Sequence, residues 1–238
     1  MKYLENSTLS NLSMQLDENA LDCALETRLE CYSCKMVTSE KRTFNNFLHE
    51  HARDGDANSY QTLSPPAMDD AFVPADFVTV GSAPKTSDES SDSPGLETAD
   101  FISNKTLFYL IETLNASFPD YAFFSASGRD FFKAPSIAHF MQSVDTKLLV
   151  SVANYNSLKM YLWAAVDAAI DLKNSIAYSY LPGSNGDPFT EPGCIWSFNN
   201  IIYNRRLNRI LFFSCRAMAP QSVELDESDF ACQWDLDA

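Results

Sequence analysis

The apolar positions of this 238-residue chain are densest between Gly193 and Arg216, GCIWSFNNIIYNRRLNRILFFSCR. Two arms rich in β-branched and aromatic residues, Cys194–Tyr203 and Leu207–Cys215, flank a short polar and basic turn, Asn204–Arg206. This arrangement is typical of an antiparallel β-hairpin. Strand side chains alternate between two faces, and both faces of this hairpin are largely apolar, so we expect it to lie centrally in a sheet that is covered on both sides. In the first arm Trp196, Phe198, Asn200 and Ile202 oppose Ile195, Ser197, Asn199, Ile201 and Tyr203, and in the second Leu207, Leu211, Phe213 and Cys215 oppose Ile210, Phe212 and Ser214.

The N-terminal part of the chain predicts a helix and then a strand. Leu9, Leu12 and Leu16 share one helical face, and Asn6 or Ser7 can cap that helix. The segment Leu25–Lys35 then alternates, which favours a strand with one solvated face. Its buried side consists of Leu25, Thr27, Leu29, Cys31 and Ser33, and its solvated side of Glu26, Arg28, Glu30 and Tyr32. The next segment, Ser39–His51, fits either a helix or a hairpin that returns on the preceding strand.

Residues 101–220 predict three helices and further strands. The first helix follows a Ser103 cap and ends at Phe118. The second has Pro135 as its first residue, and the third begins at Asn156 or Ser157. Tyr121–Phe124 and Ser175–Leu181 read as strands, and Pro182–Gly193 as a loop. The fold class that follows is α+β: one domain with a central, mainly antiparallel sheet flanked by helices.

Charge divides the chain into four stretches. Residues 1–53 carry 6 basic and 8 acidic side chains (−2), 54–100 carry 1 and 10 (−9), 101–220 carry 10 and 8 (+2), and 221–238 carry none and 6 (−6). We therefore assign 1–53 and 101–220 to the globular domain, 54–100 to a disordered acidic regulatory linker and 221–238 to an acidic tail. Closing a flexible loop of this length costs only about 3.4 kcal/mol, so both halves can share one domain.

The overall net charge of −15 disfavours several classes of partner. Duplex affinity comes mainly from neutralising phosphates, so we expect no direct nucleic-acid binding. The expected partners are proteins with basic surfaces.

The sequence also predicts no membrane association. The N-terminal residues contain no signal-peptide core, and no apolar run reaches the roughly 20 residues that a membrane-spanning helix needs.

No residue pattern points to catalysis, and we expect neither an enzyme nor a cofactor. The chain contains no nucleophile elbow, phosphate-binding glycine loop or zinc-protease motif. Cys31 and Cys34 form a CxxC pair without a second pair at matching spacing, so we expect free thiols and no metal. Asp167 and Asp171 are spaced to share a helix face, where an acid–base pair is one interpretation and a solvated face the other.

The hairpin turn supplies the candidate binding residues. Arg205, Arg206 and Arg209 form a basic run without an intervening acid. It is either a solubilising turn or a partner-binding patch, to which Trp196 and Tyr203 would add aromatic contacts; as the alternative, Trp196 is a core residue. The acidic tail 221–238 would compete with an acidic partner if it folded back on this patch.

The run WSFNNIIYNRRLNRILFFSCR resembles the C-terminal signature of the Maf family of RNA polymerase III repressors, which is unrelated to the leucine-zipper Maf factors. Further matches follow the family's order along the chain: Met1–Asn6, Tyr32–Lys35, Leu63–Pro66, Lys105–Ile111, Pro119–Tyr121, Tyr178–Tyr180 and Asp187–Phe189. Asn208 departs from the family pattern, since a basic residue is usual there.

The resemblance implies a repressor that binds RNA polymerase III and blocks its recruitment by the promoter-bound TFIIIB-type initiation factor. It also implies control by kinases and phosphatases under nutrient (TOR) signalling, and shuttling between nucleus and cytoplasm. Candidate phosphorylation residues are Ser64, Thr86 and Ser93, of which Ser64 matches the family's motif best. The alternative function is a phosphorylation-regulated interaction scaffold unrelated to transcription.

Overall fold

The computed structural model describes residues 1–51, 60–65, 100–183 and 186–220. Five α-helices lie in this part of the chain: α1 (Ser7–Glu18), α2 (Thr38–His51), α3 (Asn104–Ser117), α4 (Ile137–Ser151) and α5 (Tyr155–Ile170). The strands are β1 (Lys2–Leu4), β2 (Ala24–Ser33), β3 (Tyr60–Thr62), β4 (Phe101–Ser103), β5 (Phe131–Lys133), β6 (Ile176–Tyr180), β7 (Cys194–Asn204) and β8 (Arg209–Met218). Two 3-10 turns, η2 (Gly128–Asp130) and η3 (Leu172–Asn174), complete the described elements.

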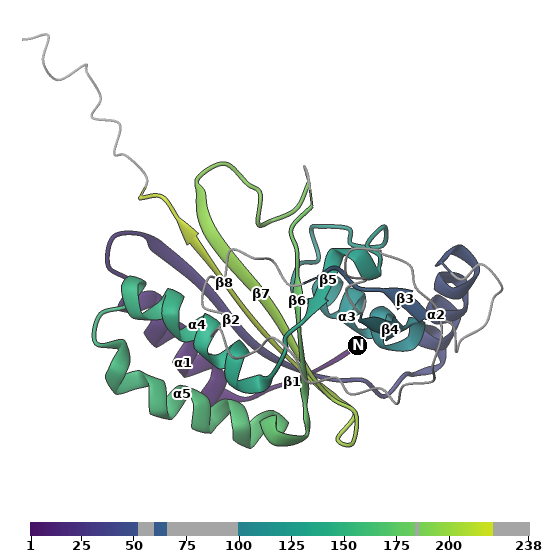
Figure 1. The fold of residues 1–238 in the computed structure, drawn as a ribbon, viewed down its shortest axis with the longest axis horizontal. Coiled ribbons are helices and arrows are strands. Elements are labelled where there is room, and N and C mark those ends of the chain that lie inside the picture. Colours follow the sequence, from purple (N-terminus) through teal and green to yellow (C-terminus); the bar gives the residue numbers. More distant parts are fainter. Residues whose placement is uncertain (52–59, 66–99, 184–185, 221–238) are drawn as a thin grey trace, which may run out of the picture.

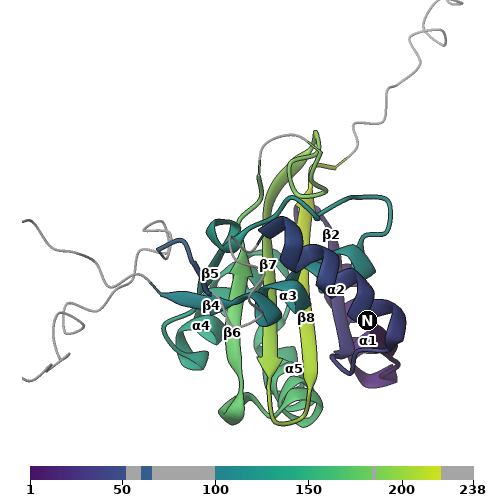
Figure 2. The ribbon, with the colours of Figure 1, turned by 90° about the vertical axis from the view of Figure 1, so that its right-hand side faces the viewer.

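A six-stranded antiparallel sheet forms the centre of the molecule, in the order β1-β2-β8-β7-β6-β5. The predicted hairpin, β7 and β8, therefore occupies the middle of the sheet. Helices α1, α4 and α5 lie along one face, while α2, α3 and the small β3–β4 sheet lie on the other (Figure 1). Figure 2, turned by 90°, shows α2 and α3 in front of the strands. The predicted α+β fold is thus confirmed.

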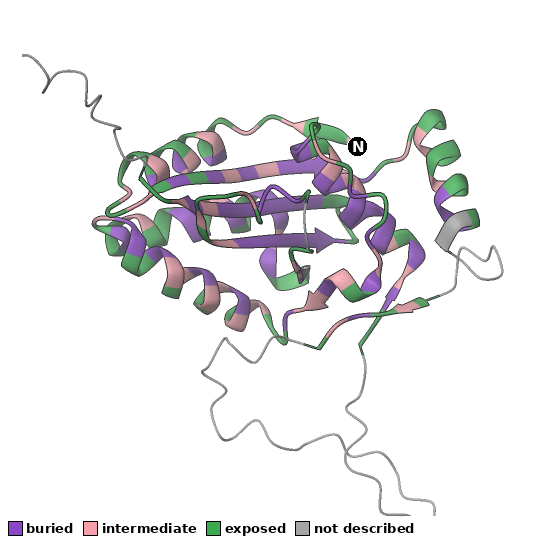
Figure 3. Cartoon of the chain, turned by 90° about the horizontal axis from the view of Figure 1, so that it is seen from above, coloured by how far each residue is buried: buried purple, intermediate pink, exposed green. Residues whose placement is uncertain are grey.

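Each face of the sheet carries its own hydrophobic core, as the alternation of the hairpin predicts. The first core includes Leu9, Val144, Leu162, Phe198, Ile202, Leu211 and Phe213, and the second includes Leu107, Ile111, Ile201, Tyr203, Ile210 and Phe212. The ring of Phe213 lies 5.1 Å from that of Phe198 in the first core, and the ring of Phe212 lies 6.2 Å from that of Phe118 in the second. Figure 3 shows the central strands and the inward sides of the helices as buried.

The starts of α1 and α3 follow the predicted capping chemistry, whereas α5 begins at Tyr155, before the predicted Asn156 or Ser157, and its N-cap Asn154 makes no side-chain capping bond. The Asn6 side chain accepts hydrogen bonds from the N–H groups of Thr8 and Leu9, and the Ser103 side chain accepts one from Thr106 N–H. These bonds satisfy amides that the first helical turn leaves without a partner. The segment Ser39–His51, which the sequence left as either a helix or a hairpin, is helical and belongs to α2. Its Phe47 and Leu48 pack into the second core.

Other local predictions were wrong. Residues 121–124 are irregular and form no strand; the strand of this region is β5, which pairs with β6. Pro135 precedes α4, because Ser136 is the N-cap that binds His139 N–H. Tyr32 is buried in the second core and not solvated, and its ring lies 5.7 Å from that of Tyr3 in β1.

The range 54–100 assigned to the linker contains an ordered piece. Tyr60–Thr62 pairs with Phe101–Ser103 as β3 and β4, and Leu63 is buried. Backbone bonds join Leu63 N to Asp100 O and Ser64 N to Phe131 O, both at 2.9 Å. Residues 60–65 therefore belong to the domain. Residues 54–59 and 66–99 of the predicted linker, and the predicted tail 221–238, lie outside the described residues.

Candidate partner-binding surface

The turn between β7 and β8 comprises residues 205–208 and is anchored on both sides. The Asn204 side chain is fully buried, donates to Ile170 O at 2.8 Å and accepts from Leu207 N at 3.0 Å. Asn208 adopts the left-handed conformation (φ 50°), which asparagine tolerates better than most residues, and its carbonyl accepts from Cys34 N at 2.9 Å. Leu207 was predicted to be the first residue of the second strand, but it lies in the turn, and the strand begins at Arg209.

The three predicted arginines are exposed at this turn and at the start of β8. Within the described residues, Arg205, Arg206 and Arg209 form no ion pair; Arg209 Nη1 lies 3.4 Å from Ala169 O. Arg216 is different, because it pairs with Glu26 and Glu191 at the other end of β8. The turn therefore presents charges that are open to a partner, and Arg216 does not.

Sheet register brings further cations to the same place. Lys2 pairs with Ser33, which in turn pairs with Arg209, and Lys35 follows that row. Lys173 lies in η3, which contacts β7 and is tied to Asn204 through Asp171 O. We call the exposed residues Lys2, Lys35, Lys173, Arg205, Arg206 and Arg209 the basic end. A hollow of about 550 Å³ beside Lys2 and Arg209 has Tyr3, Leu4, Ala168 and Ala169 in its wall.

The two aromatic candidates differ in their position relative to the basic end. Tyr203 is 8% exposed and packs against Tyr109 of α3, with ring centroids 5.9 Å apart. Trp196 is half-buried near the opposite end of β7, stacked beside Phe198, with Lys147 Nζ 6.0 Å from its ring. Trp196 therefore lies away from the three arginines, whereas Tyr203 lies next to the turn, one register pair from Arg209, with its side chain in the second core.

The C-terminal tail starts far from the basic end. The ten residues of β8 separate Met218 from the turn by about 30 Å, and the chain leaves the sheet beside Gly193, whose carbonyl accepts from Ala219 N. Figure 1 shows the β7–β8 turn and the end of β8 at opposite ends of the sheet. A tail that reached the turn would have to run back along the whole hairpin.

Among the phosphorylation candidates, only Ser64 is described; Thr86 and Ser93 lie outside the described residues. The Ser64 hydroxyl donates to Arg129 O at 2.5 Å, and its backbone N–H donates to Phe131 O. This side chain therefore helps to hold residues 60–65 against η2 and β5.

The carboxylates and thiols have structural partners. Asp167 accepts from Leu172 N and Asp171 accepts from Asn174 Nδ2, so the two carboxylates hold η3 through separate hydrogen bonds and do not act as an acid–base pair. Burial raises the pKa of the Cys34 thiol to about 12, which keeps it protonated at neutral pH. The described residues contain no group of three or more His, Cys, Asp or Glu placed to hold a metal ion, and no helix among them is long and apolar enough to cross a bilayer.

Comparison with known proteins identifies the family. The model of the family described as Maf1 regulator matches residues 25–214, which is most of the chain. The chain belongs to the Maf1 regulator family. The Repressor of RNA polymerase III transcription of Dictyostelium discoideum is 29% identical over 95% of this chain and 88% of its own length. The Repressor of RNA polymerase III transcription maf1 of Schizosaccharomyces pombe is 28% identical over 93% and 84%.

A solved structure of this Maf1 family has the same architecture. The crystal structure of citrus MAF1 in space group P 31 2 1 superposes with a TM-score of 0.59 and 25% identity, covering 90% of this chain and 99% of that chain. The hairpin signature that indicated the family therefore forms the centre of the shared fold.

Proposed function

We propose that this Maf1 family member represses transcription by RNA polymerase III. The observation that carries the proposal is the similarity to two proteins named as repressors of that transcription, which extends over 95% and 93% of this chain. Similarity over nearly the whole length covers both halves of the domain and both faces of the sheet, so it is not the mark of a single shared motif.

The repressor acts as a competitor for a surface and makes or breaks no covalent bond. It binds the polymerase and blocks its recruitment by the promoter-bound TFIIIB-type initiation factor. The basic end supports this mode, because six exposed cations from five separate elements or loops converge on it. A cationic surface of this kind increases the association rate with an acidic protein surface and fixes the orientation of the complex.

Phosphorylation controls the repressor in this proposal, and kinases and phosphatases are its further partners. A phosphate on Ser64 would replace the hydroxyl that donates to Arg129 O by a dianion that cannot donate there. The carbonyl would repel it, so residues 60–65 would leave their place against β5. Such a change, driven by nutrient signalling, would set activity and the distribution between nucleus and cytoplasm.

Order of addition in a purified transcription system tests the function. The full chain is added to a tRNA gene with RNA polymerase III and its initiation factor, either before the polymerase meets the factor or after the complex has formed. The proposal predicts loss of transcripts mainly in the first order. Equal transcript levels with and without the chain would contradict repression, and equal inhibition in both orders would contradict the block to recruitment.

A further inference from the structure

The hollow of about 550 Å³ beside Lys2 and Arg209 lies between β1 and the last turn of α5, and we call it the basic-end hollow. Sheet register sets the position of its two cations, because Lys2 pairs with Ser33 and Ser33 pairs with Arg209. Cross-strand partners project from the same face, and neighbouring strands lie about 4.8 Å apart. Lys2 and Arg209 therefore flank Ser33, with their Cα atoms about 10 Å apart.

Both cations project from the face of the sheet that α5 covers. Arg209 precedes Leu211 by two residues, and Lys2 precedes Leu4 by two, so each pair shares a face. Leu211 belongs to the first core, and Leu4 packs against it. The two long side chains therefore rise beside Ala168 of α5, which also lines the hollow.

The charges of Lys2 and Arg209 are free to bind a partner. Neither side chain has an ion pair within the described residues. Arg209 Nη1 lies 3.4 Å from Ala169 O, a contact that uses one of the five N–H donors of the guanidinium. One carboxylate, that of Glu5, also lines the hollow, so the lining keeps an excess of positive charge.

Below these charges the hollow is apolar. Leu4, Cys31, Ala168 and Ala169 line it. Cys31 and Ala169 are only 4% and 6% exposed and form its bottom, whereas Ala168 is exposed and Leu4 is half-buried. A large apolar side chain of a partner would leave water here and pack against these groups, which favours binding.

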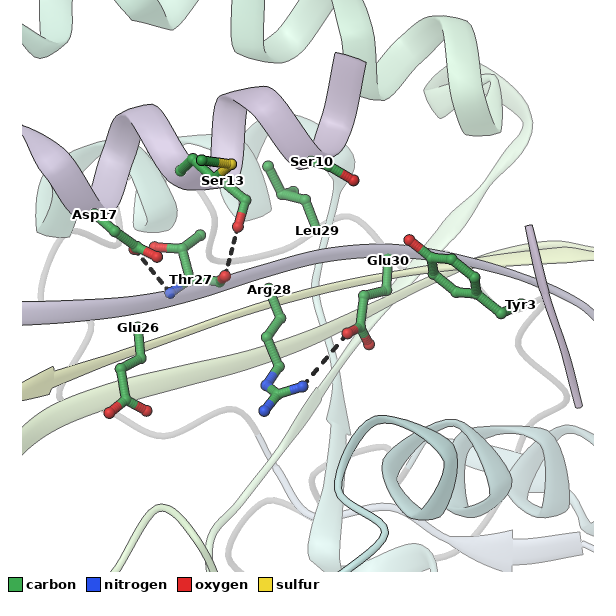
Figure 4. A pocket seen from close by; sticks show the side chains of 10 residues that line it. Tyr3, Ser10, Ser13, Asp17, Glu26, Thr27, Arg28, Leu29 and Glu30 are labelled. Atoms are coloured by element: carbon green, nitrogen blue, oxygen red, sulfur yellow. Dashed lines mark hydrogen bonds and ion pairs between the residues drawn. The ribbon is translucent and has the colours of Figure 1, made fainter. Parts of the chain in front are cut away.

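A second hollow, of about 440 Å³, lies along β2 beside α1, and its polar groups already bind one another (Figure 4). Thr27 N donates to Asp17 Oδ1 at 2.8 Å, and Thr27 O accepts from Ser13 Oγ at 2.6 Å. Glu30 pairs with Arg28 at 3.5 Å. These groups are therefore not available to a partner, in contrast to the cations of the basic-end hollow.

We propose that the basic-end hollow receives an acidic segment of a partner protein that carries one large apolar side chain next to a carboxylate. The carboxylate binds between Lys2 and Arg209, and the apolar side chain enters the hollow against Leu4 and Ala168. This inference rests on the proposed function, in which the polymerase binds the basic end, and it names the chemistry of the segment that binds there. An anchor side chain in a pocket contributes much of the affinity of an interface, whereas charges mainly set the association rate and the orientation.

Two other occupants are a second copy of the chain and the chain's own tail. A second copy would bring one basic end against another, and like charges at an interface disfavour such pairing. The tail 221–238 has six acidic and no basic residues, so its charge would fit, and a deletion variant separates it from a partner.

The probe is a capped pentapeptide, Asp-Glu-Phe-Asp-Glu, added to the full chain with isotope-labelled alanine and leucine methyl groups. Nuclear magnetic resonance then reports which methyl groups the phenylalanine ring touches. The proposal predicts shifted signals for Leu4 and Ala168 and Overhauser contacts from the ring to both. The signal of Ala164, one turn earlier on α5, stays unchanged. Absence of ring contacts at Leu4 and Ala168 would overturn the proposal.

Two control peptides separate the anchor from the charge. Asp-Glu-Ala-Asp-Glu keeps the carboxylates without the ring and should bind at least about tenfold more weakly. Lys-Lys-Phe-Lys-Lys keeps the ring with reversed charge and should show no contact at Ala168. If the alanine peptide binds as tightly as the parent peptide, no apolar side chain enters the hollow and the proposal fails.

A matched pair of variants tests the place of binding. Ala168→Phe fills the hollow with a ring of the chain's own, whereas Ala164→Phe makes the same change at another exposed position of α5. We expect the affinity for the parent peptide to fall at least about tenfold in the first variant and to stay within about twofold in the second. Equal affinity of the two variants would contradict the proposed site.

Deletion of residues 221–238 tests the tail as the occupant. The proposal predicts the same ring contacts, and an affinity within about twofold, with and without the tail. If the peptide reaches Ala168 only after the deletion, the hollow belongs to the tail and the proposal of a partner segment is overturned.

The peptide measurements and the transcription assay fail separately, because no polymerase is present in the former. A chain that represses transcription but shows no peptide contact at Ala168 keeps the proposed function and loses this inference. A chain that binds the peptide in the hollow but does not repress loses the proposed function instead.

Discussion

Asn204 donates its side-chain amide to the carbonyl of Ile170 and so joins the hairpin turn to the end of α5, at 2.8 Å and out of contact with water. The same side chain accepts from Leu207 N inside the turn. One residue thus holds the two arginines that follow it in a fixed position. A docking surface benefits from this rigidity because less conformational entropy is lost on binding.

Replacing Asn204 with alanine should therefore lower the free energy of unfolding by about 2 kcal/mol, because it removes the buried hydrogen bond to Ile170 O, which keeps only its bond from Ser175 Oγ, and leaves the amide of Leu207 without its acceptor. Urea denaturation of the full chain measures the loss. Asn19→Ala is the control, since the Asn19 side chain also donates to a carbonyl, that of Gln15, but at the exposed end of α1. Similar losses in the two variants would mean that the Asn204 bonds contribute no more than an exposed cap.

Asp17→Asn should change how stability depends on pH. Burial raises the pKa of Asp17 to about 6 from an ordinary 3.8; the hydrogen bonds with Thr27 offset part of this, and the charge of Glu26 adds to it. Between pH 3.8 and about pH 6 the folded chain binds more protons at Asp17 than the unfolded chain does. The contribution of Asp17 to stability therefore falls as the pH rises through this window.

Asparagine keeps the acceptor for Thr27 N–H and removes the charge. The variant should be more stable than the wild type by about 1–2 kcal/mol at pH 8, a figure reduced to allow for the partial exposure of the carboxyl group. The difference should shrink as pH falls through 6 and be nearly gone at about pH 4. Urea melts of both chains at several pH values measure it, and a difference that stays constant across this range would contradict the raised pKa.

Ser64→Glu should release residues 60–65 from the domain. The glutamate cannot donate to Arg129 O, and its charge would lie against that carbonyl. We expect amide exchange at Leu63, whose N–H donates to Asp100 O, to become about tenfold faster or more. Ser64→Ala is the control that removes only the hydroxyl, at a cost of about 1 kcal/mol. Equal exchange in the glutamate variant and the wild type would show that the hydroxyl does not hold this segment.

Long periodic elements could be predicted from the sequence, and short strands could not. The alternation through Phe198, Phe212 and Phe213 assigns both faces of the hairpin because each apolar side chain has a core to enter. Strands β1, β3 and β5 have three residues each, too few to establish a period. Their hydrogen-bond partners are distant in the sequence, so tertiary contacts alone decide their conformation.

The candidate site was predictable only in part for the same reason. Arg205 and Arg206 stand together in the sequence, and a polar turn between two strands must be exposed. Lys2, Lys35 and Lys173 join them only through strand register and the position of η3, which no local pattern reveals. Tyr203 lies next to the turn, as its place in the sequence indicates, but it follows the alternation of β7 into the second core and presents little surface to a partner.

A charge-reversal pair of variants tests whether the basic end binds RNA polymerase III. Arg205→Glu/Arg206→Glu alters the turn, and Arg129→Glu/Lys133→Glu makes an equal change in charge near β5, at the opposite edge of the sheet from β1. The affinity of each full chain for purified polymerase is measured at low and moderate salt. The account predicts binding at least about tenfold weaker for the turn variant, with a reduced dependence on salt, and an affinity within about twofold of the wild type for the control. Equal affinity of the two variants, or wild-type affinity of the turn variant, would contradict it.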